Sequence, residues 1–390
     1  MKAGLLGRKL GHSLSPQIHR FFGDYEYRLY EKEPEEVERF LRVGFADGDF
    51  DFLNVTIPYK QTVFELCDEL SPMAQKLGNV NFVMRTADGK LRGDNTDAFG
   101  VGRLLEANGI DVRGWNCAIL GAGGAAMTVK AVLEERGAKR VTFVRRGEGP
   151  SQDDDLIVNA TPVGMFPDVD GVRIDISRYA ACKAVLDLVY NPSPTRLVRE
   201  ALACGKIAAD GMMMLIAQAY RAFLLSNSTT QPLKHSNNLF LYGPPASGKS
   251  TWAKRIAAAT GWVLVDLDAE IVKAEGRSIP EIFAAEGEKG FREIEKKCLS
   301  SVCGDETSPP PGVCPGQVVA LGGGALLDPE SRKLAEAAGR VVVMDCAIET
   351  LKARLTGGDR PLSADAAKLE ALVKSRAAHY ASFPNHVEMV

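Results

Sequence analysis

A glycine-rich segment late in the chain has the composition of a phosphate-binding loop. It reads Gly-Pro-Pro-Ala-Ser-Gly-Lys-Ser-Thr over residues 243–251, after the apolar run 239–242 and before a helical pattern at 252–260. Such a loop turns backbone N–H groups toward phosphate oxygens and supplies an ammonium and a hydroxyl that can bind Mg²⁺. The pattern predicts a nucleotide site formed by Gly243, Ser247, Gly248, Lys249, Ser250 and Thr251.

Two carboxylates follow this loop. The run 263–266 has the pattern of a strand, and continuation through Asp268 would place Asp266 and Asp268 on the same side, because side chains alternate along a strand. One carboxylate could then lie near the metal and the other could accept a hydrogen bond from a substrate hydroxyl. The alternative is that they cap the helix that follows.

A second glycine-rich turn, at 121–126, follows the apolar run 117–120. Glycines at these spacings permit a tight turn and the close approach of a pyrophosphate to a helix N-terminus. The next apolar run, 141–144, ends in two arginines where NAD-specific proteins tend to have an acidic residue. Guanidiniums suit a 2′-phosphate, which favours NADPH. The predicted contacts are Gly121, Gly123, Gly124, Ala125, Arg145 and Arg146.

Polar segments nearer the N-terminus could act on a small substrate. Ser13 and Ser15 lie in a turn before a helix, where hydroxyls cap a helix or bind a carboxylate. Lys60 follows the strand-like run 52–55, and Asp97 lies in a polar turn before another helix. Viewed singly, Lys60 fits a surface charge and Asp97 fits a helix cap, so these two residues alone leave the chemistry open.

The elements that must position these residues follow from the hydrophobic pattern. Apolar runs alternate with amphipathic segments before residue 226, which predicts parallel sheets with crossover helices and therefore an α/β fold. The runs cover residues 2–6, 52–55, 117–120, 141–144, 156–159 and 184–188. The polar segment 226–238 has neither helical nor strand periodicity and predicts a linker.

Bulk composition limits the classes of partner and compartment. The 390 residues suffice for about two or three domains. A net charge of −3 gives no basic field for nucleic acid or an anionic membrane, so we expect small-molecule partners. No apolar run reaches about 18 residues, and we expect a cytoplasmic protein. The eight cysteines contain no C-x-x-C pair, which favours free thiols over a zinc site.

An ordered set of motifs in the first 226 residues resembles shikimate dehydrogenase. The motifs are Ser13-Leu-Ser15, the segments 54–60, 95–97, 121–124, 159–165, 187–192 and 211–218, and Asn81. The resemblance implies a catalytic pair of Lys60 and Asp97. It implies that shikimate is bound by Ser13, Ser15, Thr56, Asn81, Asp97, Tyr190 and Gln218, and that Asn159, Thr161 and Gly211 contribute to the cofactor site.

The implied reaction is the reduction of the C3 ketone of 3-dehydroshikimate by hydride from a nicotinamide. An ammonium at Lys60, hydrogen-bonded to Asp97, can stabilise and protonate the developing alkoxide. Only residues 147–155 separate two strands between which the family has another helix and strand. We therefore expect the cofactor sheet to lack one edge, with NADPH binding retained but weakened on its adenosine side.

Residues 239–390 resemble shikimate kinase. The resemblance rests on the phosphate-binding loop, on 266–268, 287–295, 322–324 and 360–362, and on the segment 376–380. It implies that Lys249 binds phosphates, that Ser250 and Asp266 lie at Mg²⁺, and that Arg360 comes from a lid and neutralises charge on the transferred phosphoryl group. It implies that the catalytic Asp268 holds the shikimate hydroxyls and that Arg292, Gly323, Gly324 and Arg376 bind its carboxylate.

The two resemblances together imply a bifunctional enzyme of aromatic biosynthesis that uses NADPH, ATP and Mg²⁺ and binds neither nucleic acid nor membrane. The expected domains are a substrate-binding domain at 1–100, a shortened Rossmann-type NADP domain at 101–227 whose last helix returns to the first domain, a linker at 228–238, and a kinase-like P-loop domain at 239–390. The sequence leaves open whether the protein forms a homo-oligomer. Two alternatives are an active kinase with a sensor in place of the dehydrogenase, and a quinate or shikimate dehydrogenase that uses NAD.

Overall fold

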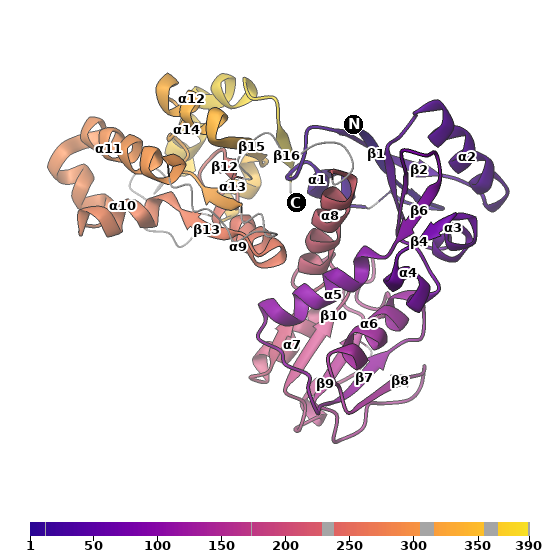
Figure 1. The fold of residues 1–390 in the computed structure, drawn as a ribbon. Coiled ribbons are helices and arrows are strands. Elements are labelled where there is room, and N and C mark those ends of the chain that lie inside the picture. The colour runs from indigo at the N-terminus through magenta and orange to yellow at the C-terminus, as the bar shows by residue number, and fades with distance from the viewer. Residues whose placement is uncertain (12, 173, 228–237, 305–315, 355–365, 389–390) are drawn as a thin grey trace. The chain divides into compact units, whose positions relative to one another are not determined.

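The computed structural model describes residues 1–11, 13–172, 174–227, 238–304, 316–354 and 366–388 (Figure 1). The chain divides into two compact units. One contains Met1–His19 and Tyr25–Thr230, and the other contains Arg20–Asp24 and Gln231–Val390. Both units consist of sheets packed against helices, which confirms the predicted α/β class. Among the described residues, no helix is long and apolar enough to cross a membrane.

The first sheet has six strands in the order β2-β1-β3-β5-β6-β4. The pairs β1–β2, β1–β3 and β4–β6 are parallel, but β5 runs antiparallel to both β3 and β6, so the expectation of parallel sheets is only partly met in this sheet. The reason is the five-residue connection 86–90, which is too short for a crossover helix and joins β5 to β6 as a hairpin. The strands are β1 Lys2–Gly7, β2 Glu26–Glu31, β3 Phe52–Val55, β4 Glu69–Leu70, β5 Phe82–Arg85 and β6 Leu91–Asp94.

Short helices surround this sheet. In α2, Val37, Leu41 and Phe45 repeat every four residues and are buried, so one face of the helix packs on the sheet. Their cluster includes Leu53 and Val55 of β3, the strand that leads to Lys60. The helices are α1 Ser15–His19, the 3₁₀ helix η1 Pro34–Glu36, α2 Val37–Asp47, α3 Lys60–Leu66 and α4 Pro72–Leu77.

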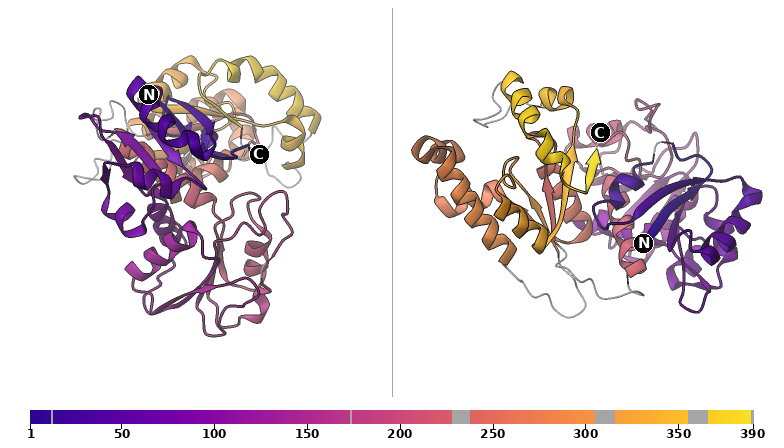
Figure 2. Two further views of the ribbon diagram at one scale, coloured as in Figure 1. Left: turned by 90° about the vertical axis from the view of Figure 1, so that its right-hand side faces the viewer. Right: turned by 90° about the horizontal axis from the view of Figure 1, so that it is seen from above.

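The second sheet has five parallel strands in the order β11-β10-β9-β7-β8. Helices cover both of its faces (Figure 2). Alternate residues of β7 divide between the two faces, because Cys117 and Ile119 face α5 (Thr96–Ala107) and α6, whereas Ala118 and Leu120 face α7. The elements are β7 Asn116–Leu120, α6 Gly124–Glu135, β8 Arg140–Val144, β9 Leu156–Asn159, η2 Ile176–Arg178, β10 Ala184–Asp187, α7 Arg196–Ala203 and β11 Ile207–Ala209.

The link between β8 and β9 contains no helix or strand. Strand β8 is the outermost strand of the sheet, as the shortness of this link predicts. Two carboxylates hold the link to the sheet. Asp154 is buried and pairs with Arg140 at 2.9 Å, and Asp155 accepts a hydrogen bond from the backbone N–H of Asn116 at 2.9 Å. The fold therefore closes this edge without a crossover helix.

Two helices, α5 Thr96–Ala107 and α8 Met212–Asn227, pack side by side between the two sheets of the first unit (Figure 1). Their close approach requires a small residue at Gly100, because a Cβ there would lie 2.8 Å from Cγ of Met214. The N-terminal turn of α5 carries Asp97. The packing of α5 against α8 therefore fixes the position of Asp97.

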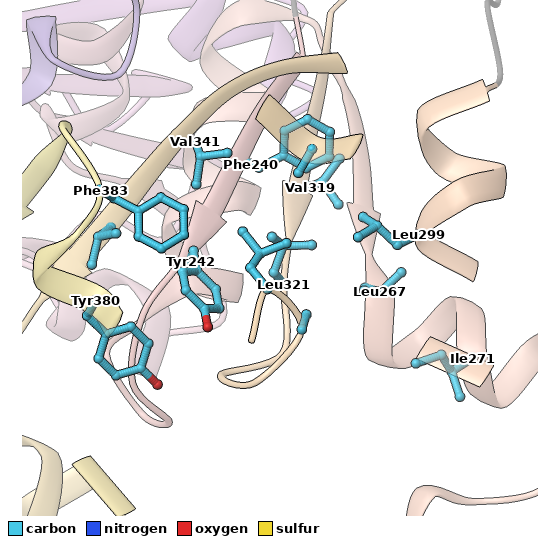
Figure 3. Close-up of a cluster of buried hydrophobic side chains, with 14 of the residues drawn as sticks. Phe240, Tyr242, Leu267, Ile271, Leu299, Val319, Leu321, Val341, Tyr380 and Phe383 are labelled. Carbon is cyan, nitrogen blue, oxygen red and sulfur yellow. The ribbon is translucent and has the colours of Figure 1, made fainter. Parts of the chain in front are cut away.

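The C-terminal unit has a five-stranded parallel sheet in the order β13-β14-β12-β15-β16. One face packs a large apolar cluster that includes Phe240, Leu321 and Val341 (Figure 3). The elements are β12 Asn238–Tyr242, α9 Lys249–Thr260, β13 Val263–Asp266, α10 Leu267–Glu275, α11 Ile279–Gly304, β14 Gln317–Ala320, α12 Pro329–Ala338, β15 Gly339–Asp345, α13 Ile348–Arg354, α14 Ala366–Ala381 and β16 His386–Glu388.

Candidate active sites

A pocket of about 260 Å³ lies in the first unit, between its two sheets. One wall comes from the first sheet and its helices, and the other comes from the N-terminus of α6 and the segment before α8. It gathers every substrate residue expected of the dehydrogenase-like part, together with three expected cofactor residues. The lining includes Ser13, Ser15, Thr56, Lys60, Asn81, Asp97, Tyr190 and Gln218, with Gly124, Ala125 and Gly211 opposite.

Lys60 and Asp97 form an ion pair in this pocket, with Nζ 2.5 Å from Oδ2. Lys60 begins α3, directly after the turn that follows β3, and Asp97 lies in the first turn of α5. A carboxylate is favoured there by the positive end of the helix. The two side chains are 20% and 12% exposed, so the pair is shielded but still reachable from the pocket. The ammonium is therefore held at one place in the lining of the pocket.

A buried network of amides and hydroxyls lies behind this pair. The backbone N–H of Thr96 donates to Oδ1 of Asn81 at 2.6 Å, and Nδ2 of Asn81 donates to Oγ1 of Thr96 at 3.1 Å. Oε1 of Gln218 accepts from Thr96 Oγ1 and from Asn54 Nδ2, each at 3.4 Å. Sequence reasoning missed Asn54 and Thr96, although both stand inside the motifs that named Thr56 and Asp97.

The two serines lie at the start of α1. Oγ of Ser13 accepts a hydrogen bond from the backbone N–H of Ser15 at 3.2 Å and lies 3.1 Å from Oγ of Ser15. Ser15 is buried and Ser13 is half-buried. The predicted turn ahead of a helix is present, and both hydroxyls line the pocket.

The opposite wall fits a dinucleotide pyrophosphate. Gly121 has a φ of +107° and lies against Ala160 and Thr161, so a side chain there would be strained. A Cβ on Gly123 or Gly124 would meet no atom within 4 Å, so the first turn of α6 faces open space. Gly123 is the N-cap and supplies no side-chain cap, which leaves helix N–H groups for an anion.

Asn159 and the two arginines differ in their surroundings. Asn159 is buried, its Nδ2 donates to Asp187 at 2.9 Å, and its Oδ1 accepts from the hydroxyl of Thr161 at 2.6 Å. Burial raises the pKa of Asp187. The amide of Asn159 is thus engaged in fixing the turn that carries Thr161. Arg145 and Arg146 are exposed at the end of β8.

Gly211 lies where the chain passes closest to its own backbone. A Cβ there would lie well inside van der Waals contact of the carbonyl oxygen of Leu188, and both residues line the pocket. We expect Gly211→Ala to destabilise the first unit by about 1–3 kcal/mol and to lower dehydrogenase activity. Thermal unfolding measures the first effect. Gly123→Ala is the control for crowding, since its Cβ would enter open space, and its melting temperature should fall less than that of Gly211→Ala even though alanine is the poorer N-cap.

In the second unit, the phosphate-binding loop forms a cradle of backbone N–H groups. Gly243, Ala246 and Gly248 have φ values of +126°, +62° and +91°, a left-handed geometry that turns N–H groups inward. Nζ of Lys249 donates to the carbonyls of Gly243 and Pro244 at 2.9 and 2.7 Å. The hydroxyl of Ser247 is buried and has no hydrogen-bond partner among the described residues, so this cradle fits a phosphate ligand.

The two carboxylates after the loop are not arranged by strand alternation, so that expectation is wrong. Strand β13 ends at Asp266, whose Oδ1 accepts from the N–H of Ala269 and caps α10, and Asp268 lies in the first turn of that helix. The cap starts the helix two residues earlier than a continued strand would allow. Oδ2 of Asp266 accepts from the hydroxyl of Ser250 at 2.8 Å, and two adjacent oxygens fit Mg²⁺.

Residues 322–324 form a triple-glycine turn after β14. This turn lies among the residues predicted to bind the substrate of the second unit, a region named the acceptor site. A Cβ on Gly324 would lie 2.5 Å from the guanidinium of Arg292 in α11. The carbonyl of Gly323 accepts from Arg376 at 3.1 Å. A Cβ on Gly322 would lie 3.4 Å from Oδ1 of Asp268. The glycines therefore admit charged side chains close to the backbone. The lid residue Arg360 lies outside the described residues.

Glu295 lies beside the predicted substrate residues Arg292 and Asp268, and sequence reasoning did not single it out. It is 2% exposed, forms an ion pair with Arg292, and its Oε1 has no hydrogen-bond partner within the described part of the chain. Burial raises its pKa, and the Arg292 charge opposes that shift. The sequence did contain a signal for this pair, because Glu295 follows Arg292 by three residues on one helix, and that spacing places the two side chains on the same face. The ion pair holds the guanidinium of Arg292 close to Gly324.

Comparisons with known proteins match both parts of the chain. Residues 5–83 match the family model of the shikimate dehydrogenase substrate binding domain, and residues 245–389 match that of shikimate kinase. The shikimate dehydrogenase (NADP(+)) of Clostridium beijerinckii is 35% identical over 242 residues, which are 56% of this chain and 89% of the relative. That of Methanopyrus kandleri is 37% identical over 267 residues, 59% and 91% of the two chains.

Solved structures match the same part. Shikimate 5-dehydrogenase from Thermus thermophilus, solved in complex with NADP(H) and shikimate, superimposes with a TM-score of 0.53 at 31% identity. The match covers 58% of this chain and 94% of the other. Shikimate dehydrogenase 1 from Peptoclostridium difficile gives a TM-score of 0.53 at 31% identity, covering 59% and 93%.

Proposed function

Because this chain belongs to the shikimate dehydrogenase family in its N-terminal part and carries a shikimate kinase domain in its C-terminal part, we propose that it catalyses two consecutive reactions. The first is the reduction of 3-dehydroshikimate to shikimate with NADPH. The second is the phosphorylation of the 3-hydroxyl of shikimate by MgATP. At the level of the two families, the protein is a bifunctional shikimate-pathway enzyme that uses NADP and ATP.

The observation that carries the dehydrogenase proposal is the position of the Lys60–Asp97 ion pair inside a pocket lined by hydroxyls and amides. Bound NADPH supplies the hydride. Lys60 donates a hydrogen bond to the substrate carbonyl oxygen and then its proton, because negative charge develops there in the transition state. Asp97 holds the ammonium in place. Asn81 and Gln218, fixed by Thr96, bind ring hydroxyls.

The kinase proposal rests on the cradle and on the charges around the triple-glycine turn. Phosphoryl transfer depends mainly on positioning and on neutralisation of charge. Lys249 and the N–H groups of the loop bind the phosphates, and the oxygens of Ser250 and Asp266 hold Mg²⁺, which lowers the charge repulsion at the phosphates. Asp268 accepts a hydrogen bond from the attacking hydroxyl, while Arg292 and Arg376 hold the acid.

A matrix of substrates and cofactors on the full chain tests both reactions. NADPH oxidation with 3-dehydroshikimate is measured without ATP, and ADP release with shikimate is measured without NADPH. We expect both activities, with NADPH preferred over NADH. ADP release without NADPH oxidation would favour a sensor in place of the dehydrogenase, and preferential oxidation of quinate with NAD would favour the other alternative.

The arginine pair gives a separate prediction about cofactor choice. Arg145→Ala combined with Arg146→Ala should raise the KM for NADPH by roughly tenfold or more, because each guanidinium contributes a charge-assisted hydrogen bond to the 2′-phosphate. The KM for NADH should stay the same. Arg113→Ala is the control, because Arg113 is exposed and paired with Asp111. Equal increases for both cofactors would contradict a 2′-phosphate contact.

A further inference from the structure

Tyr242 carries a buried hydroxyl that the proposed kinase chemistry does not use. It is the last residue of β12 and directly precedes the phosphate-binding loop. Its side chain is 0% exposed, and its hydroxyl has no hydrogen-bond partner among the residues that the structure describes. Since an unsatisfied buried hydroxyl is costly, such a group indicates a missing partner.

The Tyr242 hydroxyl faces away from the strand residues Phe240 and Val341 of the apolar core (Figure 3). Figure 3 shows it at the end of the ring opposite Phe240 and Val341, on the side where Tyr380 places its own hydroxyl. The rings of Tyr242 and Tyr380 pack edge to face, with centroids 5.3 Å apart. Tyr380 donates its own hydroxyl to the carbonyl of Gly323, so the ring of Tyr242 packs against a residue that is bound to the triple-glycine turn.

The neighbouring acceptors do not satisfy this hydroxyl. The carbonyl of Gly323 already accepts from Tyr380 at 2.7 Å and from Arg376 at 3.1 Å. Oε1 of Glu295 is also buried without a partner in the described part of the chain, so Glu295 and Tyr242 do not satisfy each other. Burial raises the pKa of Tyr242, which keeps the hydroxyl protonated and therefore a donor at neutral pH. A donor beside two guanidiniums suits an anion.

We propose that the Tyr242 hydroxyl donates a hydrogen bond to the carboxylate of the phosphoryl acceptor, as a third anchor beside Arg292 and Arg376. The inference rests on the proposed kinase function. It assigns a substrate-binding role to the residue that directly precedes the phosphate-binding loop. An acceptor without a carboxylate would leave this hydroxyl unsatisfied, so Tyr242 also contributes to selection of an acid.

Tyr242→Phe in the full chain tests the proposal, because it removes one oxygen and preserves the packing of the ring. We expect the KM for shikimate to rise by roughly tenfold, with the KM for ATP unchanged. The dehydrogenase activity of the same chain is the internal control and should equal that of the wild type. Competition by shikimate methyl ester, which lacks the anion, should be equally weak in the two proteins.

Stability provides a second measurement. Tyr242→Phe removes a hydroxyl that has no partner among the described residues, and it should leave the melting temperature unchanged or raised. The matched variant Tyr380→Phe loses the hydrogen bond to Gly323 and should melt lower. An unchanged KM for shikimate, or equal losses of melting temperature in both variants, would overturn the proposal. A wild-type chain that does not phosphorylate shikimate would instead overturn the kinase function itself.

Discussion

Lys60→Ala slows the turnover of dehydroshikimate to shikimate by about 10²–10⁴-fold, the usual contribution of a positioned proton donor. The reason is geometric. Nζ of Lys60 lies 2.5 Å from Asp97 and faces the pocket, so its removal leaves the developing alkoxide without a donor. Steady-state measurement of NADPH oxidation gives the change in turnover, and ADP release by the same chain should equal that of the wild type.

The control for this variant is Lys76→Ala. Lys76 also forms a lysine–carboxylate pair, with Glu135 at 2.9 Å, but both side chains are about half exposed. Exposed pairs contribute little to stability, about 0–1 kcal/mol, so this variant should keep normal activity and folding. Near-normal turnover in Lys60→Ala, with the melting temperature unchanged, would remove Lys60 from the mechanism.

Lys249→Ala abolishes most of the kinase activity, and we expect turnover to fall by about 10²–10³-fold, the effect of removing one preorganised charge-stabilising donor. Lys249 is 5% exposed and is held over the loop by the carbonyls of Gly243 and Pro244. Without the ammonium, the negative charge of the transferred group is opposed less strongly. ADP release with saturating shikimate measures the loss.

Lys254→Ala provides the matched control, because Lys254 lies on the same helix α9 but is exposed. It should retain kinase activity, and both variants should retain NADPH oxidation. If Lys249→Ala turns over shikimate at the wild-type rate, the loop does not bind the transferred phosphate and the nucleotide must bind elsewhere.

The sequence by itself determined the strands and the positions of the site residues along them. Runs such as 52–55 and 156–159 coincide with β3 and β9, because short buried strands of a mostly parallel sheet appear as continuous apolar runs between turns. Gly121, Gly243 and Gly248 of the two phosphate turns were readable because their positive φ angles favour glycine. Polar residues just after these strands therefore pointed to the pockets.

Only the tertiary structure decided which side chains fill the spaces between these elements. The antiparallel β5, the helical position of Asp268, and the buried amide of Asn159 depend on partners distant in sequence or on a local cap. Glu295 and Tyr242 have the pattern of an ordinary helix charge and an ordinary strand residue. The burial of Glu295 Oε1 and of the Tyr242 hydroxyl, each without a hydrogen-bond partner among the described residues, is visible only in the packed structure, because burial is a property of the assembled layers.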